Sequence, residues 1–238
     1  MFDTQTGPRR QFIACAKQGT HKKAKFGQTP YFIEVCAVVR RESWPDIRKM
    51  SVLSVKVRSP HKVGNVLPIG HFTTQRLSVC NWRPIVDGKR DRQMIETTLT
   101  TILTPNVLKH LPRSLHLGRG GISSWVDERI QESDVLLVKH TGSGELVGLM
   151  ILASEPKVGN TLNLHIGYLL AESTWGQGIA TELVTGFVLA MEDHKPVKLF
   201  GGVDTGNPAS ARVLQKAGFL IDPNLSKHDI DIYIRTME

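Results

Sequence analysis

The sequence predicts an α/β (α+β) fold in which helices pack on a sheet, and two segments predict it. Residues 166–183 have the pattern of a strand, a tight turn with glycines and a helix start in immediate succession. Residues 207–218 predict a second helix: Asn207 suits the N-cap, Pro208 the first helical position and Gly218 the position after the end. An amphipathic helix beside a strand buries its apolar side against a sheet.

The first predicted helices in chain order lie between Asp91 and Glu132. Apolar residues recur there at helical spacing, apart from a break at Pro105, and Pro112 ends the run. These residues are Leu99, Ile102, Leu103, Val107, Leu108 and Leu111. A glycine-rich turn around Gly120 precedes a second apolar set, and we expect both sets to belong to the core. The second set is Ile122, Trp125, Val126, Ile130 and Leu136.

The glycine turn predicts a binding site for phosphate. A helix start leaves backbone N–H groups unpaired and carries the positive end of the helix dipole, so it stabilises an anion. Gly176 and Gly178 let the backbone approach that anion, although a glycine loop before an amphipathic helix is the plainer alternative. A P-loop would need Lys after Gly178, and a dinucleotide fingerprint would need glycine at Thr181. The apolar stripe that would hold the helix on a sheet is Ile179, Leu183, Phe187 and Met191.

Together the two segments resemble one family. Trp175–Ala180 has the pattern Trp-Gly-x-Gly-x-Ala, and Asn207–Phe219 has the pattern Asn-x-x-Ser…Lys-x-Gly-Phe. These motifs are similar to those of the GNAT superfamily of acyl-CoA N-acyltransferases, in particular its RimJ/RimL-like branch of ribosomal-protein N-terminal acetyltransferases. The resemblance covers about residues 72–238, because Thr74–Leu77 looks like the family's first strand and Leu146–Leu152 like its third.

The resemblance implies a central mixed, mostly antiparallel sheet flanked by helices, with a splayed strand pair that binds acetyl-CoA. The pantetheine arm would pair with backbone near Leu169 and Leu170, and Asn207 matches the family's asparagine that contacts the CoA arm. The pyrophosphate would meet the N–H groups of Gly176, Gln177, Gly178, Ile179, Ala180 and Thr181. Acetyl-CoA is therefore the expected co-substrate, and the chemistry requires no metal.

Acyl transfer to an amine asks for few side chains. The site must hold the amine neutral, stabilise a developing oxyanion, and protonate or solvate the departing thiolate. Ser210 matches the family's serine and is expected to be catalytic, whereas Leu214 stands where many members place a tyrosine acid. His165 is the best local candidate for the base, because imidazole accepts protons near neutral pH; the alternative is a histidine that packs or faces solvent. Glu172 is a second candidate, or a solvated acid near the helix entrance.

Residues 1–71 lie outside the resemblance and form a basic N-terminal extension before the acetyltransferase domain at 72–238. The extension contains 13 Lys and Arg against 4 Asp and Glu, whereas the remainder contains 17 against 18. A basic arm can attract ribosomal RNA, other nucleic acid or acidic membrane surfaces. The alternatives are a disordered extension and a mis-called start of the reading frame. Within the extension, Tyr31–Val39 predicts a buried strand that is too short to cross a membrane.

The cysteines Cys15, Cys36 and Cys80 are widely spaced, and the start of the chain lacks a signal-peptide pattern, so we expect a reducing cytoplasm and no membrane partner. The expected function is acetyl-CoA-dependent N-acetylation of a primary amine by direct attack on the thioester. The amine would belong to a protein N-terminus, ribosomal or other, or to a small molecule, and the enzyme would be a monomer or homodimer. Two alternatives stay open: a non-catalytic acetyl-CoA-binding regulatory module, and a basic RNA-associated protein that uses the fold as a scaffold.

Overall fold

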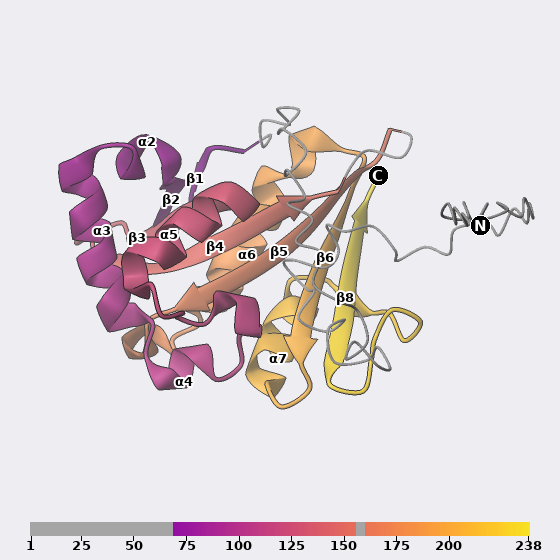
Figure 1. Cartoon of the computed structure of the whole chain (residues 1–238). Helices are drawn as coiled ribbons and strands as arrows, with labels where there is room; N and C mark the ends of the chain where they lie inside the picture. The colour runs from indigo at the N-terminus through magenta and orange to yellow at the C-terminus, as the bar shows by residue number, and fades with distance from the viewer. Residues whose placement is uncertain (1–68, 156–159) are drawn as a thin grey trace, which may run out of the picture.

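The computed structural model describes residues 69–155 and 160–238 (Figure 1). The predicted strand Tyr31–Val39 and nearly all of the basic extension lie outside these described residues. The domain boundary expected at residue 72 falls inside the first strand, and Ile69 before it is already buried. In the described ranges no helix is long and apolar enough to cross a membrane.

One sheet of eight strands runs through the described part, in the spatial order β1-β2-β3-β4-β5-β6-β8-β7. The strands are β1 (His71–Thr73), β2 (Leu77–Asn81), β3 (Asp134–His140), β4 (Leu146–Ser154), β5 (Leu162–Leu170), β6 (Val197–Asp204), β7 (Leu220–Ile221) and β8 (Ile230–Met237). All neighbours pair antiparallel except β5 and β6, which are parallel. The predicted mixed, mostly antiparallel sheet is thus confirmed.

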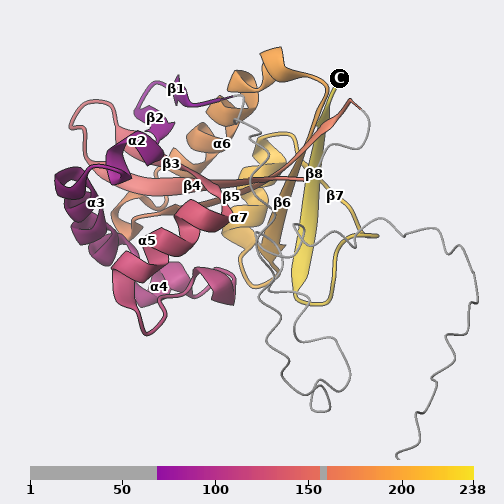
Figure 2. The ribbon, with the colours of Figure 1, turned by 45° about the horizontal axis from the view of Figure 1, so that its top comes forward.

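Helices cover both faces of this sheet, and Figure 2 shows α5 and α6 on opposite sides of it. The helices are α2 (Arg83–Val86), α3 (Lys89–Ile102), α4 (Pro105–Leu108), α5 (Gly121–Glu132), α6 (Ile179–Ala190) and α7 (Pro208–Lys216), with short 3-10 turns η3 (Arg113–Leu115), η4 (Glu172–Thr174) and η5 (Glu192–His194). Because side chains alternate along a strand, β4 serves both cores: Leu149 packs with the α3 and α5 core, and Met150 with the α6 and α7 core.

The predicted helices form where their local signals indicate. The stripe of α6 is fully buried and faces the sheet; its members are Ile179, Leu183, Phe187 and Met191. At the start of α7 the side chain of Asn207 accepts a hydrogen bond from Ser210 N at 3.1 Å. Gly218 follows the end of this helix with a φ of 80°. Between Asp91 and Glu132, the chain forms three helices, as predicted, with Pro105 opening the second of them.

The parallel pair β5 and β6 separates partway along its length. Leu162 to His165 pair with Val197 to Phe200, and the ladder then stops. Beyond that point β5 keeps its pairing with β4, and β6 keeps its pairing with β8. The splayed strand pair that the resemblance implies is confirmed.

The predicted first strand at Thr74–Leu77 is wrong, because this segment is the turn between β1 and β2, and only Leu77 belongs to a strand. The physical reason is a set of polar contacts that closes the turn. Thr74 N donates to Leu77 O at 2.8 Å, and Leu77 N donates to Thr74 Oγ1 at 3.0 Å. The segment Leu146–Leu152 is a strand as predicted, and it belongs to β4, the fourth strand of the described residues rather than the third.

We predict that Gly186→Ala destabilises the fold, although alanine is the better helix former. A Cβ at this position of α6 would lie 2.4 Å from Thr74 Cγ2 and 3.3 Å from the ring of Phe72. Overpacking of this kind costs roughly 1–3 kcal/mol, more than the gain of about 1 kcal/mol in helix propensity. The free energy of unfolding, measured by urea titration, should therefore fall. Gly70→Ala is the control, because no atom lies within 4 Å of its Cβ position. A stability gain in Gly186→Ala would contradict this packing.

Candidate functional site

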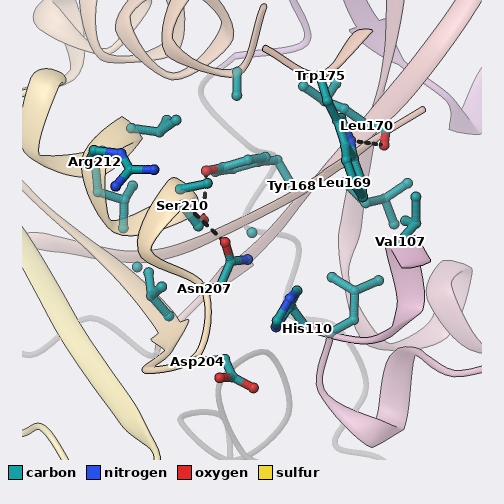
Figure 3. Close-up of a pocket in the computed structure, with 18 of the residues that line it drawn as sticks. Val107, His110, Tyr168, Leu169, Leu170, Trp175, Asp204, Asn207, Ser210 and Arg212 are labelled. Carbon is teal, nitrogen blue, oxygen red and sulfur yellow. Dashed lines mark hydrogen bonds between the residues drawn. The ribbon is translucent and has the colours of Figure 1, made fainter. Parts of the chain in front are cut away.

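A cavity of about 740 Å³ lies where β5 and β6 separate. Ile166–Leu170 line it from β5, and Gly201–Asp204 line it from β6. The turn before α6, the start of α7 and the segment around α4 complete the wall (Figure 3). Past the fork, no strand in the described part of the chain pairs with the edges of β5 and β6 that face each other. The cavity is therefore bordered by backbone groups that can pair with a ligand.

The glycine turn lines one end of this cavity. Gly176 and Gly178 have φ angles of 72° and 77°, in the left-handed region where a side chain is costly. Gly178 is the N-cap of α6, and its carbonyl accepts a hydrogen bond from Glu182 N at 3.0 Å. The N–H groups of residues 179–181, in the first turn of α6, have no intrahelical partner, so they can bind an anion. Ile179, Ala180 and Thr181 all line the cavity.

Glu182 anchors this turn to the rest of the fold. Its carboxylate accepts hydrogen bonds from Thr74 Oγ1 at 2.6 Å, from Arg76 N at 2.7 Å and from Arg76 Nε at 2.6 Å. Arg76 Nη1 in turn donates to Gln177 O at 3.0 Å. Burial by itself would raise the pKa of Glu182, but the hydrogen bonds from Thr74 and Arg76 outweigh it and lower the pKa. Gln177 is not among the residues that line the cavity, and its side chain donates to Ser173 O at 2.6 Å.

The start of α7 and the end of β5 form the walls beside the fork (Figure 3). Asn207, Ser210, Leu169 and Leu170 all line the cavity, as does Tyr168. The hydroxyls of Tyr168 and Ser210 are 2.7 Å apart and share a hydrogen bond. Burial raises the pKa of Tyr168 to about 12, although the hydrogen bond with Ser210 works in the opposite direction. The structure thus brings Ser210 and Asn207 together with a tyrosine on the facing strand.

His165 lies next to the cavity in sequence but does not line it. Its side chain is buried, its ring is stacked on Phe200 with centroids 4.9 Å apart, and its Nε2 is 3.1 Å from Glu155 Oε1. The hydrogen bond with His165 is the main cause that lowers the pKa of Glu155, and burial opposes it. These contacts hold the imidazole in the protein interior, away from the cavity.

Glu172 joins the end of β5 to α4. Its carboxylate accepts hydrogen bonds from Thr104 Oγ1 and, at 2.9 Å, from Asn106 Nδ2. Both contacts lower its pKa. The carboxylate therefore holds the segment around α4 against the cavity. Across residues 69–155 and 160–238, no group of three or more His, Cys, Asp or Glu side chains could hold a metal ion.

Sequence reasoning missed several polar residues that line the cavity. Tyr168 belongs to the strand pattern of residues 166–170. Its hydroxyl contacts Ser210 on α7, and this long-range contact cannot be inferred from the sequence around Tyr168. His110 comes from the turn after α4, close to Gly206. Asp204 comes shortly before the Asn207–Phe219 motif and Arg212 lies inside it, and this proximity was the available signal.

Solved structures with the same fold include three acetyltransferases. One is a GNAT-family acetyltransferase from Bacillus anthracis, with a TM-score of 0.54 and 15% identity over 70% of this chain and 98% of that chain. Another modifies the N-terminal serine of a 50S ribosomal subunit protein in Salmonella typhimurium, with a TM-score of 0.53 and 14% identity over 69% and 97% of the two chains. The third is spermidine N-acetyltransferase from Vibrio cholerae in complex with CoA and spermine, with a TM-score of 0.52 and 13% identity over 69% and 97%.

No curated protein sequence matches this chain. The sequence profile of the acetyltransferase (GNAT) domain matches residues 92–220, which is more than half of the chain. This match runs from α3 to the start of β7 and includes the fork, the glycine turn and α7. The chain belongs to the GNAT acetyltransferase family.

Proposed function

We propose that this protein is an acetyl-CoA-dependent N-acetyltransferase of the RimJ/RimL-like type that acetylates a primary amine. The observation that carries the proposal is the cavity at the fork of β5 and β6, which runs from the glycine turn to Tyr168 and Ser210. A related fold, that of the Vibrio cholerae spermidine N-acetyltransferase, holds CoA together with a polyamine. Family membership, the fork and the glycine turn support the same cofactor.

Acetyl-CoA would be held mainly by backbone groups. Its pyrophosphate would receive hydrogen bonds from the amides of residues 176–181, where the dipole of α6 favours negative charge. Its pantetheine would pair with the free edge of β5 near Leu169 and Leu170, through the backbone groups of the alternate residues that do not bond to β4. Asn207 would contact the same arm. Arg212 and Lys216 also line the cavity and offer positive charge to phosphate groups.

The reaction would be direct attack of the amine nitrogen on the thioester carbon. The C–N bond forms, the C–S bond breaks with its electron pair on sulfur, and the amine loses one proton. Ser210 would stabilise the sulfur. Two histidines are candidates for the proton acceptor: His165, which the sequence predicts, and His110, which lines the cavity beside Asp204 and Gly206. We favour His110, because a base must come within hydrogen-bond reach of the amine.

The acceptor would be an amine on a protein N-terminus or on a small molecule. Asp204 lines the cavity and offers a carboxylate to an ammonium group before it loses its proton. We also propose that the enzyme is cytoplasmic and is a monomer or homodimer. The basic residues 1–71 would contact the ribosome. The non-catalytic acetyl-CoA-binding module is the second candidate, because Leu214 places a hydrocarbon side chain in the cavity where many relatives carry an acid.

The proposed function is tested by thiol release from acetyl-CoA with three acceptor classes: peptides with different N-termini, polyamines and amino sugars. Turnover with one class would support the enzyme and identify its acceptor. Acetyl-CoA binding without turnover in any class would favour the binding module. A second version of the protein that starts at residue 69 would show whether the preceding segment affects the rate.

We predict that Gly178→Ala weakens acetyl-CoA binding about tenfold, or roughly 1.4 kcal/mol. Its φ of 77° strains any side chain, and a shift of the turn moves the amides that would meet the pyrophosphate. Calorimetric titration with acetyl-CoA measures the effect. Gly144→Ala is the matched control, because Gly144 has a φ of 70°, has open space around its Cβ position and lies in the turn between β3 and β4. Equal affinity in the two variants would argue against the glycine turn as the phosphate site.

The two histidines should respond differently to alanine. His110→Ala should lower kcat/KM at least about 100-fold, the usual scale of general base catalysis, with unchanged thermal stability. His165→Ala leaves a cavity beside Phe200 and removes the partner of Glu155 Oε1, so it should cost roughly 2–4 kcal/mol of stability, measured by urea unfolding. His71→Ala, at an exposed site on β1, is the control for both. A stable His165→Ala variant that loses turnover, beside a fully active His110→Ala variant, would restore His165 as the base.

A further inference from the structure

Tyr168 and Ser210 share a hydrogen bond that leaves one hydroxyl hydrogen unused. Each hydroxyl carries a single hydrogen, and the 2.7 Å bond between the two oxygens uses one of the two hydrogens. Elsewhere in residues 69–155 and 160–238 neither hydroxyl oxygen has another hydrogen-bond partner. Both residues line the cavity (Figure 3), so a ligand in it can accept the second hydrogen.

The direction of the shared bond follows from the acidity of the two groups. A phenol is more acidic than an alkyl hydroxyl and is the better donor, even with the pKa of Tyr168 raised to about 12. The same pKa keeps the phenol protonated throughout the working pH range, so this donor does not switch off. On this ground we assign Tyr168 as the donor and Ser210 Oγ as the acceptor, which leaves the Ser210 hydrogen to point elsewhere.

The backbone that carries the Ser210 side chain is held in place by its own helix. Ser210 N donates to Asn207 Oδ1 at 3.1 Å, which holds the backbone of this first turn of α7 in place. One turn further along α7, Leu214 is buried and packs against Gly201, whose Cβ position would be 2.7 Å from Leu214 Cδ1. Leu214 offers no donor to the cavity, whereas β5 supplies a phenol from the facing side.

We propose that Tyr168 is a positioning residue that directs the Ser210 O–H to the departing thiolate of CoA. As the C–S bond breaks, sulfur takes the electron pair and accepts the hydrogen bond from Ser210. The proton lost by the amine passes to the base and then to solvent, and the thiolate takes a proton from solvent as CoA leaves. The pair stabilises the thiolate without giving up its own hydrogens. This inference rests on the proposed acetyltransferase function.

The test is a double-mutant cycle with Tyr168→Phe and Ser210→Ala, in the full-length protein, with the acceptor found by the thiol-release panel. Ser210→Ala should lower kcat about 100-fold, which is the scale for loss of one donor to a developing charge. Tyr168→Phe should lower kcat about tenfold, with unchanged affinity for acetyl-CoA. In the Ser210→Ala background, Tyr168→Phe should have no further effect, because it acts only through Ser210. Tyr233→Phe, a buried phenol on β8 outside the cavity, is the control.

A second readout separates leaving-group stabilisation from simple packing. The selenium analogue of acetyl-CoA has a more acidic leaving group that needs less help, so both variants should lose less kcat with it than with acetyl-CoA. If each variant lost the same share of kcat with acetyl-CoA and with its selenium analogue, the proposal would be overturned. Additive losses of kcat in the double variant would overturn it too. Full activity of Tyr168→Phe would refute the positioning role alone. No turnover by the wild-type protein with any acceptor would overturn the proposed function and this inference with it.

Discussion

The parallel ladder between β5 and β6 stops after His165 and Phe200, and the site depends on that interruption. Each strand keeps one satisfied edge, β5 against β4 and β6 against β8, so the sheet continues as a whole while the two facing edges stay open. Open edges carry amide and carbonyl groups that no strand pairs, and of these Leu170 O accepts a hydrogen bond from Trp175 Nε1 at 3.0 Å. A cavity of about 740 Å³ bordered by such groups suits an extended ligand with amides of its own.

The glycine turn at the end of the fork, where we propose that the pyrophosphate binds, is held by contacts with a distant part of the chain. Glu182 in the first turn of α6 holds the β1–β2 turn through Thr74 and Arg76, and Arg76 returns to the carbonyl of Gln177. The left-handed glycines can therefore keep their conformation without a ligand. On the other side, Glu172 attaches α4 to the end of β5, so the segment around α4 that lines the cavity is fixed to the strand at the fork.

Short sequence patterns predicted the features of this protein that depend on residues close together in the sequence. The caps of α7, the stripe of α6 and the glycine turn before α6 could be read directly. Contacts between distant residues could not be read in this way. The Tyr168–Ser210 bond joins residues 42 positions apart, and it exists only because α7 packs beside β5. His165 was the predicted candidate for the base, but Glu155 and Phe200 enclose it. Thr74–Leu77 resembled a strand, yet its polar side chains make it the turn that Glu182 binds.

Hydrogen exchange with and without acetyl-CoA tests most directly whether the fork is the cofactor site. The account predicts slower exchange within the segments 166–170 and 176–181 when acetyl-CoA is added, because the amides there that face the cavity acquire hydrogen-bond partners. The strands β1 to β3, on the far side of β4, should exchange at unchanged rates. Binding of acetyl-CoA with protection confined to other segments, and none at the fork or the glycine turn, would contradict the account.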